Sequence, residues 1–339
     1  MDLNVIWFIL LGVLIIGYAV LDGFDLGVGT LFYTLGKTKE EKKTLINSIG
    51  PVWDGNEVWL LTAGGALFAA FPFVYATVFS GFYFAMLLVL FGLIFRAIAV
   101  EYYFKTEDDP HMQKLMGRLF FIGSLLPGLL FGVAMGNVVV GIPMDEMQNY
   151  SGTFFALLNP YALLLGIVGL IGFLLQGTAY TILKTDGELQ KRAIRLTKVF
   201  SYAIIVAWLA GTLTAQIYAP HMFTNYFNYP VLFIIPLTTV AALIAIPMFL
   251  KMKHYGKLFV ASSLVIFTKI GTLAAGMFPN LVFSANSAPN LTIYNASSTE
   301  LTLRVMFIIA LIGMPLVIIY TIYVYYVFRG KATPERSGY

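Results

Sequence analysis

The chain contains no cysteine. Disulfides, thiolate metal sites and covalent attachment of haem through Cys-x-x-Cys-His are therefore excluded within it. Histidine is nearly as scarce, because His111, His221 and His254 are the only three and all fall in connections between apolar segments. None lies mid-helix, where a membrane haem takes an axial imidazole. A single methionine ligand remains open, but the sequence offers little else to hold a redox centre.

Charge is also scarce. Only 11% of the residues are charged and 59% are hydrophobic, whereas charged residues make up about a quarter of a soluble domain. A soluble domain is therefore close to excluded. Apolar runs of roughly 20 residues, the length that an α-helix needs to cross a bilayer, recur along the chain. They predict an all-α integral membrane protein with nine transmembrane helices, at about 5–31, 47–71, 74–98, 116–141, 161–183, 198–219, 231–250, 258–280 and 303–328.

Lysine and arginine are missing from every second connection. They occur in the first, third, fifth and seventh connections and in the tail, for example at Lys39, Lys114, Lys191 and Lys253, and the connections between these carry none before Arg304. This alternation follows the positive-inside rule and places the N-terminus outside and the C-terminus in the cytoplasm. It explains the net charge of +4 without a nucleic-acid partner. The first apolar run has no basic start and is expected to be kept as a helix.

A faint repeat relates residues 10–23 (LLGVLIIGYAVLDG) to residues 164–177 (LLGIVGLIGFLLQG). Both stretches run from outside to inside and precede a basic connection, which predicts a parallel repeat of four helices plus four. Asp22 aligns with Gln176, so only the first half keeps its acids. The chain is then one polytopic domain over 1–339, with a first bundle at about 5–141, a second at about 161–280 and an extra helix at about 303–328.

Two of the outside connections differ sharply in length. The second is only the tight FPFVY turn at 71–75, whereas the eighth, at 281–302, is long, polar and free of Lys and Arg. Because it contains Pro289 and several Asn and Ser residues, the eighth connection is predicted to be irregular. A solvated connector and a lid over the outside face both fit this composition.

Four carboxylates interrupt two adjacent apolar runs: Asp22 and Asp25 in the first, Asp54 and Glu57 in the second. Counted from the cytoplasmic ends of their helices, all four lie roughly 13 to 21 Å deep. Each pair is three residues apart and is expected on one helix face. A carboxylate at that depth costs several kcal/mol unless it is paired, protonated or in contact with water. These acids therefore need an explanation.

Two interpretations of the acids are open. In the first, they form structural ion pairs with Arg96, near the cytoplasmic end of the third helix, or with Lys269, midway along the eighth. In the second, they form a chain of protonatable groups that carries protons from the cytoplasm, since clustered carboxylates exchange protons readily. We favour the relay, with Asp25 and Asp54 as its main members and Glu101, a turn beyond Arg96, as a further candidate.

Five longer motifs follow one another along the chain: GFDLGVG at 23–29, GPVWDGNEVWL at 50–60, TAGGALFAAFP at 62–72, YATVFSGFY at 75–83 and LTIYNASSTELTLRVMF at 291–307. In this order they resemble subunit II of cytochrome bd-type quinol oxidases. The similarity extends from the first helix to the tail and includes the nine-helix layout. It implies a respiratory complex of the bacterial cytoplasmic membrane that oxidises quinol and reduces dioxygen to water without pumping protons.

The resemblance also implies partners and cofactors. A homologous subunit I would carry the quinol site and ligate two haems b and one haem d, with this chain as its pseudo-symmetric partner that ligates no haem. The sequence does not decide whether small single-helix subunits join the complex. It also leaves open whether this chain holds a structural quinone, as subunit II does in some members.

Carried over motif by motif, the resemblance assigns roles to individual residues. Asp25 of the GFD run and Asp54 of the WDGN run would face a hydrophilic proton path to the oxygen-reducing haem. Trp53 and Asn56 would line or brace that path. Glu57 departs from the family pattern, in which other polar residues occupy this position.

The resemblance gives no firm role to two further charged residues. Glu101 lies in a stretch that aligns loosely with the family, and Lys269 receives no role.

A proton-coupled secondary transporter is the alternative function. Carboxylates that open inward and an internal repeat both fit a transporter. The predicted repeat is parallel, however, and the acids lie in only one half, without matching helix breaks in the other. A purely structural membrane scaffold is a third class, which leaves four intramembrane acids unexplained.

Overall fold

The computed structural model describes residues 2–335, and these are mostly helical. Eight of the described helices are long and apolar enough to cross a membrane. They are α1 (Leu3–Thr30), α6 (Tyr83–Tyr102), α7 (Pro110–Val140), α8 (Pro160–Lys184), α9 (Gly187–Tyr218), α11 (Ile234–Lys251, preceded by η3, Pro230–Phe233), α12 (Tyr255–Met277) and α13 (Glu300–Val327). The ninth expected span corresponds to α4 (Trp53–Ala70), whose first two turns carry Asp54, Asn56 and Glu57 and so lower its hydropathy. Nine crossings therefore stay a prediction.

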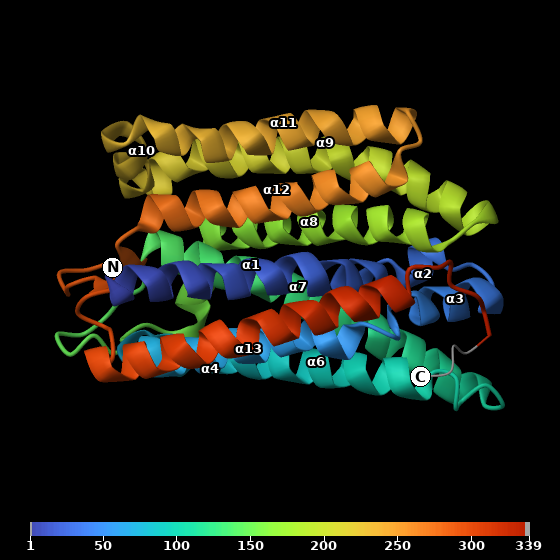
Figure 1. Ribbon diagram of the computed structural model, residues 1–339, viewed down its shortest axis with the longest axis horizontal. Coiled ribbons are helices and arrows are strands. Elements are labelled where there is room, and N and C mark those ends of the chain that lie inside the picture. Colours follow the sequence, from blue (N-terminus) through green and yellow to red (C-terminus); the bar gives the residue numbers. More distant parts are fainter. Residues whose placement is uncertain (1, 336–339) are drawn as a thin grey trace.

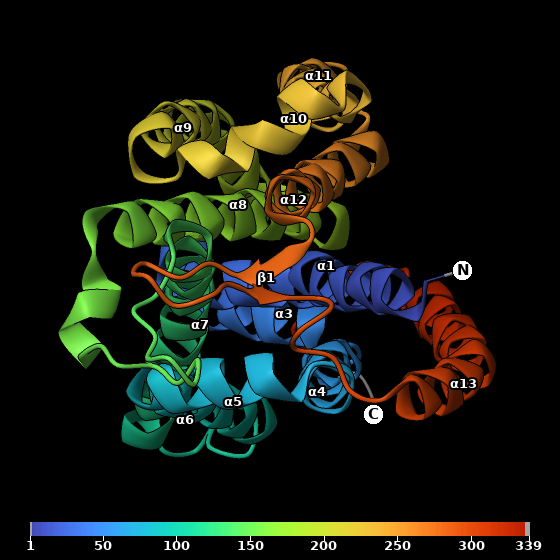
Figure 2. The ribbon, with the colours of Figure 1, turned by 90° about the vertical axis from the view of Figure 1, so that its left-hand side faces the viewer.

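Short elements join these helices. They are α2 (Phe32–Leu35), α3 (Lys39–Ile49), α5 (Pro72–Gly81), η1 (Phe154–Leu158), η2 (Pro220–Phe223), α10 (Thr224–Asn228), β1 (Asn280–Val282) and β2 (Leu291–Thr292). The second outside connection is more than the expected tight turn. Pro72 starts α5 as a separate helix that ends at Gly81, and in Figure 2 it lies across the end of the bundle between α4 and α6. The first residues of the predicted 74–98 span belong to this cross-helix.

The long helices lie side by side along one axis (Figure 1). Helices α1 and α13 run in the same direction, and α2 and α3 lie at the end where both finish. The strands β1 and β2 lie at the opposite end. Seen along the axis in Figure 2, α8, α9, α11 and α12 gather on one side of α1, whereas α4, α6 and α13 lie on the other. We call the two ends of the molecule the α3 end and the sheet end.

Helices α1 and α8 cross without side chains between them. A Cβ atom on Gly27 would lie 2.0 Å from the Phe173 carbonyl oxygen and 2.9 Å from the Cα of Gly177. Small residues at a crossing let two backbones meet, which substitutes dispersion contacts for the hydrophobic drive that is missing in lipid. The spacing of Gly23 and Gly27 thus marks where the two halves of the chain touch.

The eighth connection is mostly irregular, as expected, but two short strands pair within it. Strand β1 pairs antiparallel with β2. The segment between them packs on the chain that follows α7, where Ile142 bridges to Ser284 and the Asn286 amide donates to the Met144 carbonyl at 2.6 Å. The connection therefore covers the sheet end through fixed contacts.

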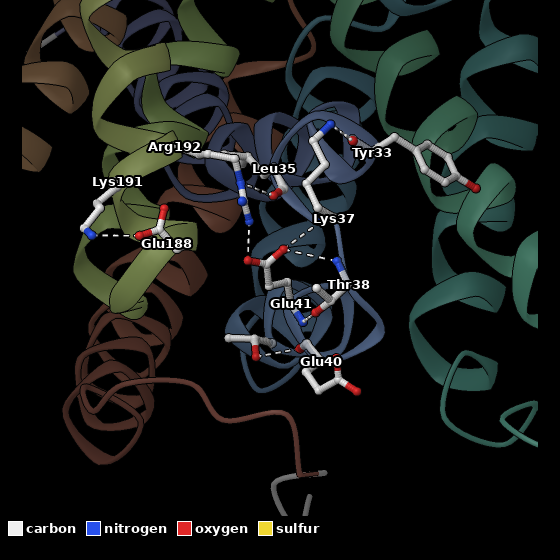
Figure 3. Close-up of polar contacts among 10 residues, drawn as sticks. Tyr33, Leu35, Lys37, Thr38, Glu40, Glu41, Glu188, Lys191 and Arg192 are labelled. Atoms are coloured by element: carbon white, nitrogen blue, oxygen red, sulfur yellow. Dashed lines mark hydrogen bonds and ion pairs between the residues drawn. The ribbon is translucent and has the colours of Figure 1, made fainter.

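A clamp of polar contacts joins the two halves at the α3 end (Figure 3). Thr38 begins α3 with a capping box, in which Glu41 N–H donates to Thr38 Oγ1 at 3.2 Å and Glu41 accepts from the Thr38 N–H at 3.2 Å. Arg192 of α9 forms an ion pair with Glu41, and its Nε donates to the Leu35 carbonyl at 2.9 Å. Glu41 thereby satisfies free N–H groups at the start of α3 and holds α9 against it.

We expect this clamp to weaken in acid. Burial opposes ionisation, but hydrogen bonds from Arg192 and from the backbone N–H groups of Lys37 and Thr38 outweigh it and lower the pKa of Glu41. The clamp contributes stability above the pKa of Glu41 in the unfolded chain and loses it as the pH falls through the lower folded value. Glu41→Gln should cost about 1 kcal/mol near neutral pH, and this difference should vanish in acid.

Thermal unfolding of the detergent-solubilised protein across this pH range measures the difference from the wild-type protein. The matched control is Glu188→Gln, because Glu188 pairs with Lys191 through side chains that are 65% and 68% exposed, and exposed pairs contribute little. A loss of stability for Glu41→Gln that stays constant at every pH would contradict the assignment.

Candidate functional site

Three charged side chains from three helices meet inside the first half of the chain. Arg96 of α6 donates from Nη1 to Asp22 Oδ2 at 2.9 Å, and its Nη2 lies 2.8 Å from Asp22 Oδ1. The same Nη2 donates to Glu57 Oε1 of α4 at 2.5 Å. Asp22 and Arg96 are fully buried, and the Glu57 side chain is 20% exposed. We call these residues the Arg96 triad.

The triad depends on the close approach of a fourth helix. A Cβ atom on Gly123 of α7 would lie 2.6 Å from the backbone nitrogen of Arg96. Helix α7 therefore packs directly on the backbone of α6 at this point. The guanidinium donates one hydrogen bond to each carboxylate, and its further short contact with Asp22 Oδ1 completes the ion pair. These contacts offset part of the cost of burying the charges. Asp22 and Glu57 are thus held in a structural ion pair.

Asp25 lies one turn further along α1 and takes no part in the triad's ion pairs. It is fully buried, and its Oδ2 accepts a hydrogen bond from the Asn56 amide at 2.8 Å. The same amide donates to the Leu21 carbonyl at 3.2 Å, while Asn56 Oδ1 accepts from the Tyr325 hydroxyl at 2.9 Å. Tyr325, Asn56 and Asp25 therefore form a chain of hydrogen bonds that links α13, α4 and α1.

Asp54 faces away from this cluster. Its side chain is exposed on the outer face of α4, together with Val58 at 43% and Leu61 at 73% exposure. A Cβ atom on Gly55 or Gly64 would meet no atom within 4 Å. The expectation that Asp54 and Glu57 share one face is not met, because Glu57 turns towards Arg96 and Asp54 turns outward.

The other predicted residues lie around the cluster. Trp53 is buried in the hydrophobic core at the start of α4. Glu101 is half-buried on α6 and has no hydrogen bond or ion pair with the residues that the structure describes. Lys269 belongs to the other half, where its Nζ lies 3.3 Å from the Val168 carbonyl. Lys269 is therefore no partner of the acids.

Several buried polar atoms near Asp25 have no hydrogen-bond partner within residues 2–335. They include Asp22 Oδ1, Asp25 Oδ1, Arg96 Nε, Thr30 Oγ1 and Ser124 Oγ. A Cβ atom on Gly29 would lie 1.9 Å from Ser124 Oγ, so this hydroxyl touches α1 one turn beyond Asp25 on the side of the α3 end. Buried polar groups are normally satisfied, and ordered water is the usual partner when protein atoms are not. The atoms mark a polar seam between α1, α6 and α7.

Sequence reasoning missed two residues of this site, Ser124 and Tyr325. Ser124 could have been noticed as a hydroxyl within the apolar run of the fourth predicted helix. Tyr325 gave no signal, since tyrosine near the end of a transmembrane helix usually marks the membrane interface.

The three histidines lie at or near the ends of helices. His221 has its Nε2 2.9 Å from the Val139 carbonyl, and its ring packs on Phe283 at 4.0 Å between centroids. His111 lies in the first turn of α7, and His254 directly precedes α12. No group of three or more His, Cys, Asp or Glu side chains within 2–335 could hold a metal ion. None of the three histidines lies in the middle of a long helix.

Comparisons with known proteins agree with the resemblance seen in the motifs. The chain matches the family model described as Cytochrome bd terminal oxidase subunit II over residues 3–328. It is 38% identical to cytochrome bd-I ubiquinol oxidase subunit 2 of Escherichia coli (strain K12), with 98% of this chain and 96% of the relative covered. It is 36% identical to cytochrome bd ubiquinol oxidase subunit 2 of Bacillus subtilis (strain 168), with 98% and 97% covered.

A chain in the structure of bd oxidase from Geobacillus thermodenitrificans has the same fold. The TM-score is 0.73 at 16% sequence identity, and the match covers 97% of this chain and 99% of that chain. The long apolar helices and the bacterial relatives identify a multi-pass protein of the bacterial cytoplasmic membrane. The chain belongs to the cytochrome bd oxidase subunit II family.

Proposed function

We propose that this chain is the subunit of a cytochrome bd-type quinol oxidase that ligates no haem and delivers protons to the site of dioxygen reduction. Family membership supports the overall reaction, in which quinol and dioxygen give quinone and water. The quinol site, two haems b and one haem d belong to the partner, subunit I. The positions of the three histidines agree with this division.

One observation carries the proton-delivery role. Asp25 is a buried carboxylate with one oxygen held by Asn56 and the other without a partner among the described residues. Asp22, only three residues away, is held in an ion pair by Arg96, whose Nη1 donates to Asp22 Oδ2. An acid locked in an ion pair exchanges its proton poorly, whereas an acid with a free oxygen beside water can take up and release one. Asp25 is therefore the proton carrier of the buried cluster.

The Arg96 triad has a supporting role in this proposal. Its guanidinium binds two carboxylates, of which Asp22 lies one turn of α1 from Asp25. Buried charges are conserved in proteins mainly where they are paired or serve transport. The triad keeps the seam polar enough to hold water while Asp25 changes its protonation state.

Water along the polar seam supplies the route from the cytoplasm to Asp25. Thr30 and Ser124 lie on the side of the α3 end, where the connections rich in Lys and Arg gather (Figure 1). By the positive-inside rule this end faces the cytoplasm, which places the N-terminus outside. Glu101, on the same stretch of α6 beyond Arg96, is a candidate for the entrance.

Asp54 continues the route towards subunit I. A carboxylate that faced lipid from an apolar helix surface would cost several kcal/mol. The neighbouring outer positions Gly55 and Gly64 have open space around them, which suits close contact with a helix of another chain. Asp54 then passes protons across the subunit interface, with Trp53 bracing the start of α4.

The two halves of the chain are proposed to be a parallel repeat of four helices, with α13 added. At the position equivalent to Asp22, Gln176 donates to Ser263 Oγ at 2.8 Å and accepts from Ser262. Neutral side chains satisfy this amide fully, so the second half has no group that titrates at the equivalent point. Proton chemistry is confined to the first half.

A reduced-minus-oxidised absorption spectrum tests the proposed complex. The chain is extracted gently from its native membrane together with the proteins that copurify with it. We expect a red-region band from a chlorin-type haem that disappears when the partner chain is removed. A colourless preparation without a haem-bearing partner would contradict the proposal and favour a proton-coupled transporter, which uptake into liposomes would then test.

A further inference from the structure

Helix α13 is weakly attached to the rest of the chain. Leu303 is the one fully buried residue among those described in this helix, and large side chains such as Ile309, Leu311 and Ile312 are more than half exposed. Within residues 2–335, two side-chain hydrogen bonds join α13 to other helices. The Trp7 indole donates to the Leu303 carbonyl at 2.9 Å, and the Tyr325 hydroxyl donates to Asn56.

The segment after α13 returns to the helical body and is fixed there. We call residues 328–335 the strap. Lys184, at the end of α8, donates to the carbonyls of Phe328 and Gly330. Lys331 forms an ion pair with Asp186 at 3.1 Å. In these contacts the strap also supplies a cation to the carbonyl end of α8, where the helix dipole favours positive charge.

The strap then reaches α3. The Asn47 amide donates to the carbonyls of Thr333 at 2.8 Å and Glu335 at 2.5 Å. Lys331 Nζ also donates to the Thr185 carbonyl at 2.8 Å. The end of α13 is thus tied to two other elements directly after the turn that carries Tyr325. An exposed helix held at this point cannot rotate or slide without breaking these contacts.

The Tyr325 hydroxyl has a defined effect on Asn56. A side-chain amide can turn over and exchange its oxygen with its NH₂ group. The Tyr325 O–H group donates to Asn56 Oδ1 at 2.9 Å, so the NH₂ group must face Asp25 and the Leu21 carbonyl. In the reversed amide, the oxygen would face the Asp25 carboxylate and repel it. Packing of the Tyr325 ring on Phe24, with centroids 6.4 Å apart, holds the phenol in place.

We propose that Tyr325 is a positioning residue for proton transfer through Asp25 and that the strap holds it in place. This inference rests on the proposed function of Asp25. Tyr325 acts through Asn56, which it keeps in the orientation that donates to Asp25. The strap acts through Tyr325, because it fixes the last turn of α13 over α4.

The test uses quinol-oxidase kinetics of the whole complex in native membranes. Tyr325→Phe keeps the ring and removes the hydroxyl. We expect kcat to fall about three- to tenfold, the worth of one buried hydrogen bond, with the KM for quinol and the haem spectrum unchanged. The pH profile of kcat should also change shape, which a loss of packing alone would not cause. Tyr326→Phe is the matched control, since the neighbouring Tyr326 is 63% exposed, and it should match the wild-type protein.

The strap is tested by Lys331→Met and by the double variant with Tyr325→Phe. Lys331→Met should lower kcat less than Tyr325→Phe does and alter the pH profile in the same sense. If the strap acts through Tyr325, the double variant should be no slower than Tyr325→Phe alone. Fully additive losses, or wild-type kcat and pH profile for Tyr325→Phe, would overturn the inference.

Asp25→Asn separates this inference from the proposed function. If Asp25→Asn is slow and Tyr325→Phe behaves as the wild-type complex, only the positioning role fails. If Asp25→Asn itself turns over normally, the proposed function fails and the positioning role fails with it. Should Tyr325→Phe not assemble, the pH profile of Lys331→Met decides: a wild-type profile overturns the inference, and a changed profile supports it.

Discussion

Replacing Asp25 with Asn is expected to slow dioxygen reduction by the complex by about 100-fold or more, because a positioned proton-transfer group usually contributes about 10²- to 10⁴-fold. Asparagine has nearly the same shape and can still bond to Asn56, so the fold should be kept. It cannot bind and release a proton, so uptake from the polar seam would stop at this point. Steady-state oxygen consumption with excess quinol measures the loss, and the haem spectrum reports on assembly.

Asp54→Asn should slow turnover as well, because the route leaves the chain at that residue. Glu188→Gln is the control, since Glu188 is an exposed acid far along the sequence from the site and should have wild-type turnover. If both Asp25→Asn and Asp54→Asn kept wild-type turnover with intact haems, the proton route through this chain would be excluded.

Replacing Arg96 with Met is expected to prevent stable assembly. The change leaves the fully buried Asp22 and the largely buried Glu57 without their cation. Removal of one partner from a buried ion pair costs about 3 to 5 kcal/mol, which is a large share of the stability of a typical folded chain. The amount of folded chain in the membrane, together with its thermal unfolding in detergent, measures the effect.

A compensating variant tests whether this loss of assembly comes from the unpaired charges or from lost packing. The triple variant Asp22→Leu, Glu57→Leu, Arg96→Met leaves no unpaired charge at the triad. Well-packed apolar replacements for a buried ion network are often neutral or stabilising, so assembly should return in this triple variant. Arg96→Lys should be intermediate, since an ammonium cannot reproduce the forked contact with Asp22. Normal assembly of Arg96→Met alone would show that the triad does not stabilise the fold.

Composition and charge were enough to predict most of the helices, because a bilayer imposes a minimum length and an apolar surface on each span. The weakest prediction was α4, where the acids and Asn56 that matter for function also reduce hydropathy. Pro72 begins a separate helix after it, a break that the expected short turn did not include. In α4 the polar residues belong to the site, and at Pro72 the sequence forms a connecting helix, so neither stretch has the apolar pattern of a simple membrane span.

The site was predictable as a set of residues but not as an arrangement. The sequence named Asp22, Arg96 and Glu57 and offered an ion pair as one interpretation of the acids, which the contacts of these three residues show. It could not tell that Asp54 turns outward, because the direction depends on how α4 rotates against its neighbours. The contact between Tyr325 and Asn56 joins residues 269 positions apart, a separation at which a single sequence carries no pairing signal.

The Arg96 triad has a consequence for how the chain enters the membrane during synthesis. Asp22, Glu57 and Arg96 emerge from the ribosome on three successive hydrophobic segments, and each segment alone carries an uncompensated charge. Insertion of a segment by the translocation machinery depends largely on how hydrophobic the segment is, and a charge near its middle makes insertion less favourable. Helix α4, the least apolar of the three, gains its neutralising cation only after α6 has been made. The first three segments are therefore expected to leave the translocon for the lipid as a group, not one by one.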